Sequence, residues 1–299
     1  MTLYELKNRY DNELKNLVKQ PGLFRDDTYS VYFKKCYFCS EIIQKMEESD
    51  YISYLTGAGS ELIEHVKNGK IIPASMSSVA SSSRFCYLSL KDSDFSVFGV
   101  KNYPFQSHPR RFEEKLPIGG GTPPHMDCYY EDDNELVCFE CKCHEQFDDH
   151  KIELAESYFS SDRIVNRIEK EYYIEEHKPI RKDGKLYYYN VISPAFVGLG
   201  DNPRFDIKQF LTHIMGIQSR LSKLKKSKAR LIYYYFIPDK VLNDSEIKKI
   251  IDQLYKEIKQ VFSSDFVKNY TDSITFELFV QYSDTVENAS NNNTKRIVL

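Results

Sequence analysis

The sequence predicts an α/β (α+β) fold in which a mixed central sheet is flanked by helices. Three observations indicate it. Residues 206–224 carry apolar side chains at helical spacing, which predicts an amphipathic helix. The apolar, tyrosine-rich run at 230–237 predicts a buried strand. Residues 126–130 and 136–143 predict two further strands, and the acidic turn 131–135 between them predicts a hairpin.

The remaining elements follow from the same kinds of signal. Helices are predicted at 1–20, 29–46, 60–66, 150–171 and 245–262, an apolar run at 85–90, a turn at 181–185 that leads into 186–192, and a strand at 274–282. We expect residues 1–56 to be a helical N-terminal extension packed on the core. Residues 57–285 are expected to form the main domain, and 286–299 a flexible polar tail.

The composition of the 299-residue chain fits a globular protein, with 41% hydrophobic and 28% charged residues. The sequence contains no run of about 18 apolar residues, so we expect no membrane-spanning helix. The N-terminus lacks the apolar core of a secretory signal, so the cytoplasm is the expected compartment. Seven cysteines, an odd number, predict reduced thiols. The net charge of -3 neither favours nor excludes a nucleic-acid partner, because binding requires only a local basic patch.

The residues with the clearest chemical meaning are Asp127, Glu140 and Lys142. Alternation along a strand places Glu140 and Lys142 on one face, and the hairpin brings Asp127 beside them. Two carboxylates at one point suit Mg²⁺, with Mn²⁺ as a substitute and the Cys141 carbonyl as a further ligand. The alternative is an ordinary ion pair on a solvated strand face. The apolar neighbours favour the functional interpretation, because a buried charged pair needs a partner or a task.

Phosphodiester hydrolysis requires these groups. A divalent cation polarises the phosphoryl oxygen and lowers the pKa of a water molecule. A nearby ammonium such as Lys142 offsets charge that develops in the transition state, or orients the attacking water.

The pattern Asp127-x12-Glu140-x-Lys142 resembles the PD-(D/E)XK motif of the restriction-endonuclease-like nuclease superfamily. Met126 stands where the motif name has proline, at a position that varies within the superfamily. Further segments resemble one branch of bacterial restriction endonucleases in order and spacing, over roughly residues 57–282: Gly59-Ser60-Glu61-Leu62, Ser81-Ser82-Ser83, Gln209-Phe210-Leu211-Thr212-His213 and the tyrosine-rich strand at 231–236.

The resemblance implies a restriction-endonuclease-like sheet and a Mg²⁺-dependent DNA endonuclease, with type II restriction as the expected activity. Asp127 and Glu140 would hold the metal and Lys142 would act on the water. Glu61, expected on a helix before the first core strand, matches an additional acidic catalytic and metal position. Gln209 matches a polar helper on the helix after the motif. The partner would be double-stranded DNA, and palindromic cutting would imply a homodimer.

Several residues are candidates for DNA contact. The hydroxyls of Ser81, Ser82 and Ser83 suit backbone phosphates. Two basic segments have the same potential, one with Arg110 and Arg111 and one with Lys225 and Lys226. The alternative for both basic segments is a solvated loop.

Three other functions remain open. One is a structure-specific or repair nuclease of the same fold, and another is a non-catalytic nucleic-acid-binding protein. The third is a zinc-stabilised interaction module that uses Cys36, Cys39, Cys138 and Cys141. It is the lesser interpretation, because Cys138 and Cys141 would point to opposite faces of a regular strand. His125 and His144 flank the predicted site without a defined role.

Overall fold

The computed structural model describes most of the chain. The described ranges are 1–18, 20–57, 61–92, 95–100, 110–118, 122–131, 134–150, 153–155, 173–182, 185–192, 199–200, 203–282 and 294–297.

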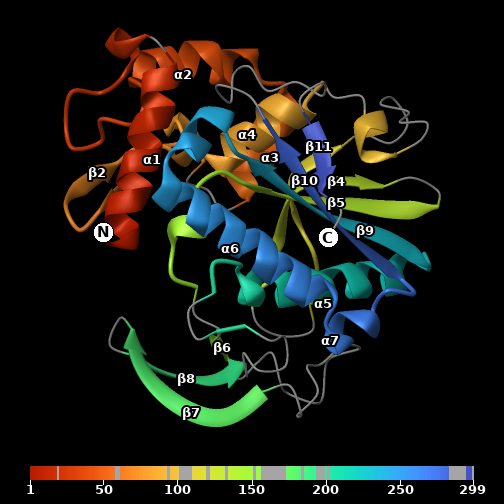
Figure 1. Cartoon of the computed structure of the whole chain (residues 1–299). Helices are drawn as coiled ribbons and strands as arrows, with labels where there is room; N and C mark the ends of the chain where they lie inside the picture. Colours follow the sequence, from red (N-terminus) through yellow and green to blue (C-terminus); the bar gives the residue numbers. More distant parts are fainter. Residues whose placement is uncertain are drawn as a thin grey trace.

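A six-stranded mixed sheet forms the centre of the molecule (Figure 1). In spatial order its strands are β11 (Thr294–Ile297), β10 (Ile274–Gln281), β9 (Lys228–Phe236), β5 (Glu135–Lys142), β4 (His125–Glu131) and β3 (Arg111–Lys115). Strand β9 runs parallel to β5 and β10, and the other neighbours are antiparallel. The predicted mixed sheet, the hairpin and the strands at 230–237 and 274–282 are confirmed. Strand β11 lies within the predicted polar tail, so that prediction is wrong for residues 294–297.

Helices cover both faces of this sheet. Helix α5 (Ile207–Leu224) and helix α6 (Ser245–Phe262) pack together on one face, where the rings of Phe210 and Phe262 stack 5.7 Å apart (Figure 1). Helix α4 (Ser82–Leu90) packs on the other face, where the thiol of Cys86 contacts that of Cys141. Both long helices are confirmed, and the apolar run at 85–90 belongs to α4. A short helix, α7 (Asp265–Lys268), precedes β10.

Three helices precede the sheet in the chain. Helix α1 (Leu3–Leu17) starts at a capping box formed by Thr2 and Glu5. Its Tyr10 is fully buried and donates a hydrogen bond to the carbonyl of Phe236, which packs α1 onto the end of β9. Helices α2 (Lys35–Glu41) and α3 (Glu48–Thr56) follow. The predicted helix at 29–46 is therefore too long, because the chain first makes an antiparallel bridge between Phe24 and Phe33.

The predicted helix at 60–66 is wrong. Residues 65–72 form a hairpin of β1 (His65–Lys67) and β2 (Lys70–Ile72). Asn68 and Gly69 both have positive φ, as a two-residue hairpin turn of the primed type requires. The Asn-Gly pair is a strong hairpin signal, and it outweighs the helical spacing before it. The proposed cap, Ser60, lies outside the described residues.

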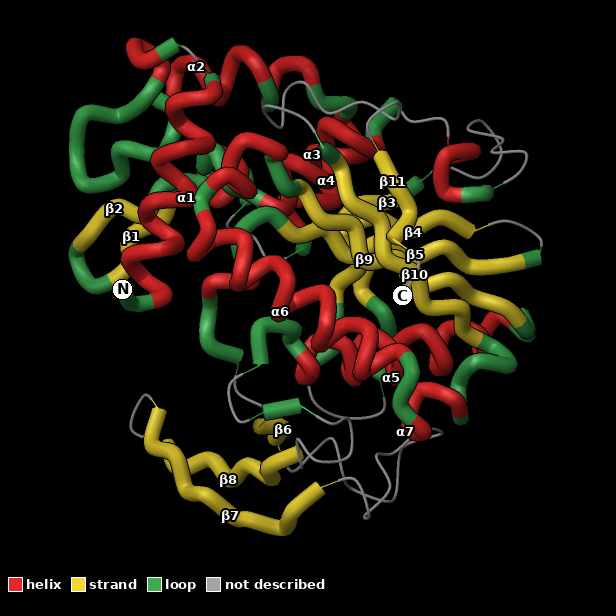
Figure 2. The backbone as a smooth tube through the Cα atoms, viewed as in Figure 1, coloured by secondary structure: helices red, strands yellow, loops and turns green. Residues whose placement is uncertain are grey.

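A separate three-stranded antiparallel sheet follows β5 in the chain and stands apart from the central sheet (Figure 2). It consists of β6 (Glu153–Ala155), β7 (Tyr173–Lys182) and β8 (Lys185–Ile192). Residues 186–192, which the sequence places after a turn at 181–185, belong to β8. The predicted helix at 150–171 is wrong at 153–155, and residues 156–172 lie outside the described ranges.

Candidate active site

The hairpin that carries the predicted acidic residues opens where those residues lie. Strands β4 and β5 are paired as far as Cys128 and Phe139. Asp127 and Glu140 come directly after this last pair. Beyond it the main-chain N–H of Cys141 donates to Asp127 Oδ2 over 2.7 Å, so a carboxylate takes the place of a backbone acceptor. The structure thus brings Asp127 against the segment of β5 that bears Glu140.

Glu140 and Lys142 share one face of β5 and form a buried ion pair, with Lys142 Nζ 2.7 Å from Glu140 Oε1. Lys142 also donates to Gln209 Oε1 over 2.7 Å. Glu140 Oε2 accepts no hydrogen bond from the described residues and faces His213 Nε2 at 3.5 Å. Strand β5 and helix α5 therefore hold an acid, an ammonium, an amide and an imidazole together.

Lys142 is firmly charged in this setting. Burial alone would lower the pKa of its ammonium, but the carboxylates of Glu140, Glu145 and Asp127 raise that pKa well above the ordinary value. A permanently protonated lysine cannot serve as a base. It can orient a water molecule or offset negative charge.

A cavity of about 450 Å³ opens beside Asp127. The predicted residues Glu61 and Gln209 line it together with Asp127, and Ser83 lies in the same lining. Glu61 is buried and its carbonyl accepts from the N–H of Met76, so it is held in a closed loop and not on the expected helix. Glu61 thus lines the same cavity as Asp127, but the predicted helix that was to carry it is absent from the described residues 61–66.

Glu113 is an acidic member of the cavity that the sequence did not reveal. It lies on β3 between Phe112 and Glu114, which pair with the two residues that flank Asp127. It is buried and has a φ of 52°. Its Oε2 is 3.5 Å from His125 Nδ1, and both side chains line the cavity. A non-glycine residue in the left-handed region is strained, and such strain persists where the surroundings impose it. No local sequence signal marks Glu113, because its role depends on pairing with β4.

His213 is the second residue that was missed. It follows Gln209 by four positions, so both side chains lie on one face of α5 and line the cavity. Burial lowers the pKa of the imidazole, although Glu140 opposes this, so His213 is neutral near pH 7. Gly216, one turn further along, lets α5 approach closely, because a Cβ there would lie 2.7 Å from Leu116 Cβ. The sequence offered one signal for His213: a titratable side chain four residues after Gln209 lies on the same face of a helix.

Burial and neighbouring acids together determine the ionisation of Asp127. Burial raises the pKa of its carboxyl well above the ordinary value, and the charges of Glu140 and Glu113 raise it further. Lys142 and the N–H of Cys141 oppose the rise. Negative charge is therefore in excess on the cavity side, where a cation would relieve the repulsion.

The donor set fits a magnesium ion. Mg²⁺ needs only one or two carboxylates and retains several waters. Asp127 and Glu140 provide the carboxylates, and Glu140 Oε2 is a buried acceptor that lacks a hydrogen bond within the described residues. Within the described ranges, no three His, Cys, Asp or Glu side chains are grouped closely enough to form a complete metal site, so Asp127 and Glu140 would hold the ion together with water. The four cysteines of the zinc alternative differ in burial, since Cys36 is exposed and Cys138 is buried, and they form no metal-binding group in the described ranges.

The three serines lie at the start of α4. The buried Ser81 is the N-cap and accepts from the N–H of Arg84 over 3.1 Å. Ser82 hydrogen-bonds Glu145, and Ser83 lines the cavity. Of the three, Ser83 is placed best to meet a phosphate, since helix N-termini favour anions.

The basic candidates are more dispersed. Arg110 is buried and pairs with Asp50 at 3.2 Å, so it is a structural ion pair and does not face solvent. Arg111 is partly exposed and contacts Glu114. Lys225 and Lys226 follow the last turn of α5, about 24 Å along the helix axis from Gln209 at 1.5 Å per residue. They lie too far from the cavity to act at the reacting bond.

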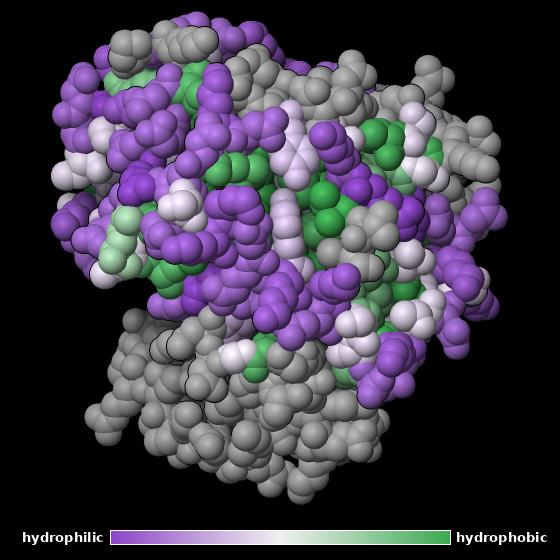
Figure 3. Space-filling view, viewed as in Figure 1, coloured by the Kyte–Doolittle hydropathy of each residue, from purple (hydrophilic) through white to green (hydrophobic). Residues whose placement is uncertain are grey.

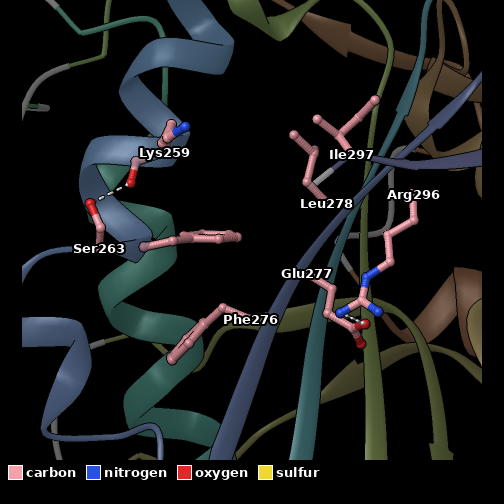
Figure 4. Close-up of a pocket in the computed structure, with 8 residues that line it drawn as sticks. Lys259, Ser263, Phe276, Glu277, Leu278, Arg296 and Ile297 are labelled. Atoms are coloured by element: carbon pink, nitrogen blue, oxygen red, sulfur yellow. Dashed lines mark hydrogen bonds and ion pairs between the residues drawn. The ribbon is translucent and has the colours of Figure 1, made fainter. Parts of the chain in front are cut away.

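A second cavity, of about 430 Å³, lies between the end of α6 and the β10–β11 edge. Figure 3 shows hydrophilic side chains along the outer face of α6 and apolar ones gathered beside that edge. Phe276, Leu278 and Ile297 line the cavity, and its charged residue Glu277 pairs with Arg296 at 2.8 Å (Figure 4). With its acid already neutralised, this cavity lacks the reactive groups found beside Asp127.

Comparisons with protein-family models, with curated proteins and with solved structures returned no match. Among the helices in the described ranges, none has both the length and the apolar character needed to cross a membrane.

Proposed function

We propose that the chain is a Mg²⁺-dependent DNA endonuclease of the PD-(D/E)XK superfamily, with type II restriction of double-stranded DNA as its activity. One observation carries the proposal. Asp127, Glu140 and Lys142, separated in sequence, meet at the open end of the β4–β5 hairpin beside a cavity that Glu61 and Gln209 also border. The mixed sheet flanked by helices supports the restriction-endonuclease-like fold.

Asp127, Glu140 and the carbonyl of Cys141 would hold the metal, with Glu61 and Glu113 as further oxygen donors at the cavity. The ion would supply Lewis acidity to the phosphodiester and the attacking water. Lys142 orients that water and offsets charge on the phosphate. Gln209 orients the Lys142 ammonium by accepting a hydrogen bond from it. The neutral His213 lies against the other oxygen of Glu140.

Cleavage of supercoiled plasmid with and without Mg²⁺ tests the proposal. Discrete bands support sequence-specific restriction, whereas a smear or flap-only cutting favours a structure-specific or repair nuclease. Asp127→Asn should abolish cleavage, since it removes a metal ligand but keeps an acceptor for the N–H of Cys141. The double variant Glu140→Gln, Lys142→Gln should lower the rate by at least about 10²-fold, the effect of losing one charge-stabilising group.

The double variant is preferred to Lys142→Ala, because a lone Glu140 would be a buried, unpaired charge. Asp239→Asn is the matched control, because Asp239 is exposed and does not line the cavity, so the substitution should leave the rate unchanged. Wild-type cutting by Asp127→Asn, with circular dichroism that matches the parent, would refute the assignment.

A further inference from the structure

The β1–β2 hairpin projects from the molecule with little cover. It stands clear at the edge in Figures 1 and 2. Every residue from His65 to Ile71 is exposed. Val66 and Ile71 are 72% and 56% exposed, although both are large apolar side chains. An isolated two-stranded hairpin is only marginally stable in water, so a bare and partly apolar one indicates a surface that a partner covers.

Its register sorts the side chains onto two faces. Val66 and Ile71 are directly opposite each other on one face. Lys67 and Lys70 are directly opposite each other on the other face, which His65 shares. Two like charges at opposed positions destabilise a strand pair unless an anion lies between them.

No protein group supplies that anion in the described part of the chain. Neither Lys67 nor Lys70 forms an ion pair there. The neighbouring acid, Glu64, is engaged by Arg25 and Lys35, at 3.8 and 3.3 Å. The exposed part of the hairpin therefore carries uncompensated positive charge.

The hairpin is also tied to the candidate active site. Its base is closed by the hydrogen bond from the N–H of Met76 to the carbonyl of Glu61, and Glu61 lines the cavity with Asp127. Asn68 in the turn lies seven positions after Glu61, so the turn can lie up to about 23 Å from the cavity at 3.3 Å per residue. That reach is comparable to the diameter of a DNA duplex.

We propose that the β1–β2 hairpin is a DNA-binding ribbon that lies against the duplex whose backbone enters the cavity. Lys67 and Lys70 contact phosphates on one side, and Val66 and Ile71 contact sugars or thymine methyl groups, as a two-stranded ribbon can in the major groove. The inference rests on the proposed function, since it takes duplex DNA as the ligand.

Fluorescence anisotropy with a labelled duplex tests the ribbon, in a salt series with Ca²⁺ in place of Mg²⁺. The slope of log Kd against log salt reports the number of phosphate contacts, at about 0.9 per contact. Lys67→Ala, Lys70→Ala should reduce the slope by about 2. The matched control is Lys256→Ala, Lys259→Ala on α6, which removes the same charge from exposed positions and should leave the slope unchanged.

The outcomes separate the two proposals. A hairpin-dependent slope without plasmid cleavage would support the ribbon and count against the nuclease. Cleavage with an unchanged slope in the hairpin variant would overturn the ribbon alone, and a wild-type chain that binds no duplex would also overturn it. Self-association that Val66→Ser, Ile71→Ser abolishes, with an unchanged slope, would mean that the hairpin binds a second copy of the chain instead.

Discussion

At the residue scale, Asp127 combines two opposing demands. Burial and the nearby acids favour the protonated form of its carboxyl, yet the proposed chemistry requires the charged form. Sites of this kind reduce the stability of the unliganded protein, because the charge is tolerated only when a ligand neutralises it. The free energy of unfolding should therefore reveal whether the cluster is a ligand site or a structural feature.

The variant Asp127→Asn should be more stable than the wild type in EDTA at pH 8. Because the folded-state pKa of Asp127 is raised, its ionisation penalises the folded chain, and the penalty grows as pH rises above the ordinary value of 3.8. Each kcal/mol regained would raise Tm by about 2–4 °C. The difference should vanish near pH 4, and Asp239→Asn should show none. Equal Tm values across this range would mean that the carboxyl is not crowded.

Addition of Mg²⁺ extends the same measurement. It should raise the Tm of the wild type at pH 8 but leave that of Asp127→Asn unchanged, because a ligand stabilises only a folded state that binds it.

At the element scale, α5 positions Gln209 and His213, and its first turn is fixed by Asp206. The Asp206 side chain caps the helix by accepting from the N–H of Gln209 and pairs with His150 at 3.3 Å. Although burial opposes both shifts, this pair lowers the pKa of Asp206 to about 2 and raises the pKa of His150.

Replacement of Asp206 should separate the cap from the ion pair. Asp206→Ala loses both the helix cap and the ion pair with His150. Loss of the cap by itself should lower the free energy of unfolding by about 1 kcal/mol. Asp206→Asn keeps the cap and loses the charge. Its deficit should be largest between pH 3.8 and 6.5, where aspartate is ionised and histidine protonated in both states, and should shrink as pH rises through the raised pKa of His150. Urea unfolding at pH 5.5 and pH 9 measures this; a pH-independent deficit would contradict it.

The elements also show what sequence patterns can and cannot reveal. Helix α5 and the β4–β5 hairpin were predictable, because the spacing of apolar residues along a helix and the residue types in a turn are local signals. The hairpin at 65–72 was missed, although Asn68-Gly69 marks it, because the spacing of residues 61–66 resembled a helix. Glu113 could not have been found, since only the pairing of β3 with β4 brings it near Asp127.

At the scale of the whole molecule, the N-terminal segment is built into the core. Besides the buried Tyr10, α1 contributes Asp11, which lies 2.8 Å from His144 just after β5, and Lys7, which pairs with Asp148 at 2.6 Å. Helix α1 thus packs against and stabilises the segment that directly follows Lys142. These contacts hold α1 against the chain after β5, and His144 has a structural role in them.

Substitution of Tyr10 tests this packing. Tyr10→Ala should destabilise the chain by about 3–5 kcal/mol, as expected for deletion of a large buried aromatic side chain. Tyr10→Phe should cost only about 1 kcal/mol for the hydrogen bond to Phe236. Unfolding followed by near-UV and far-UV circular dichroism should stay a single transition in both variants. A separate early transition in Tyr10→Ala would show that α1 unfolds independently of the sheet.

The layer of thiols beneath the site has a consequence for redox chemistry. Only the thiolate form of cysteine reacts readily with oxidants. Burial raises the pKa of Cys141 to about 12 and that of Cys86 well above its ordinary value, so both remain protonated and inert. Cys36, exposed on α2, is then the thiol that peroxide reaches first. Oxidative damage would begin on the N-terminal helices and spare the strands that hold Asp127.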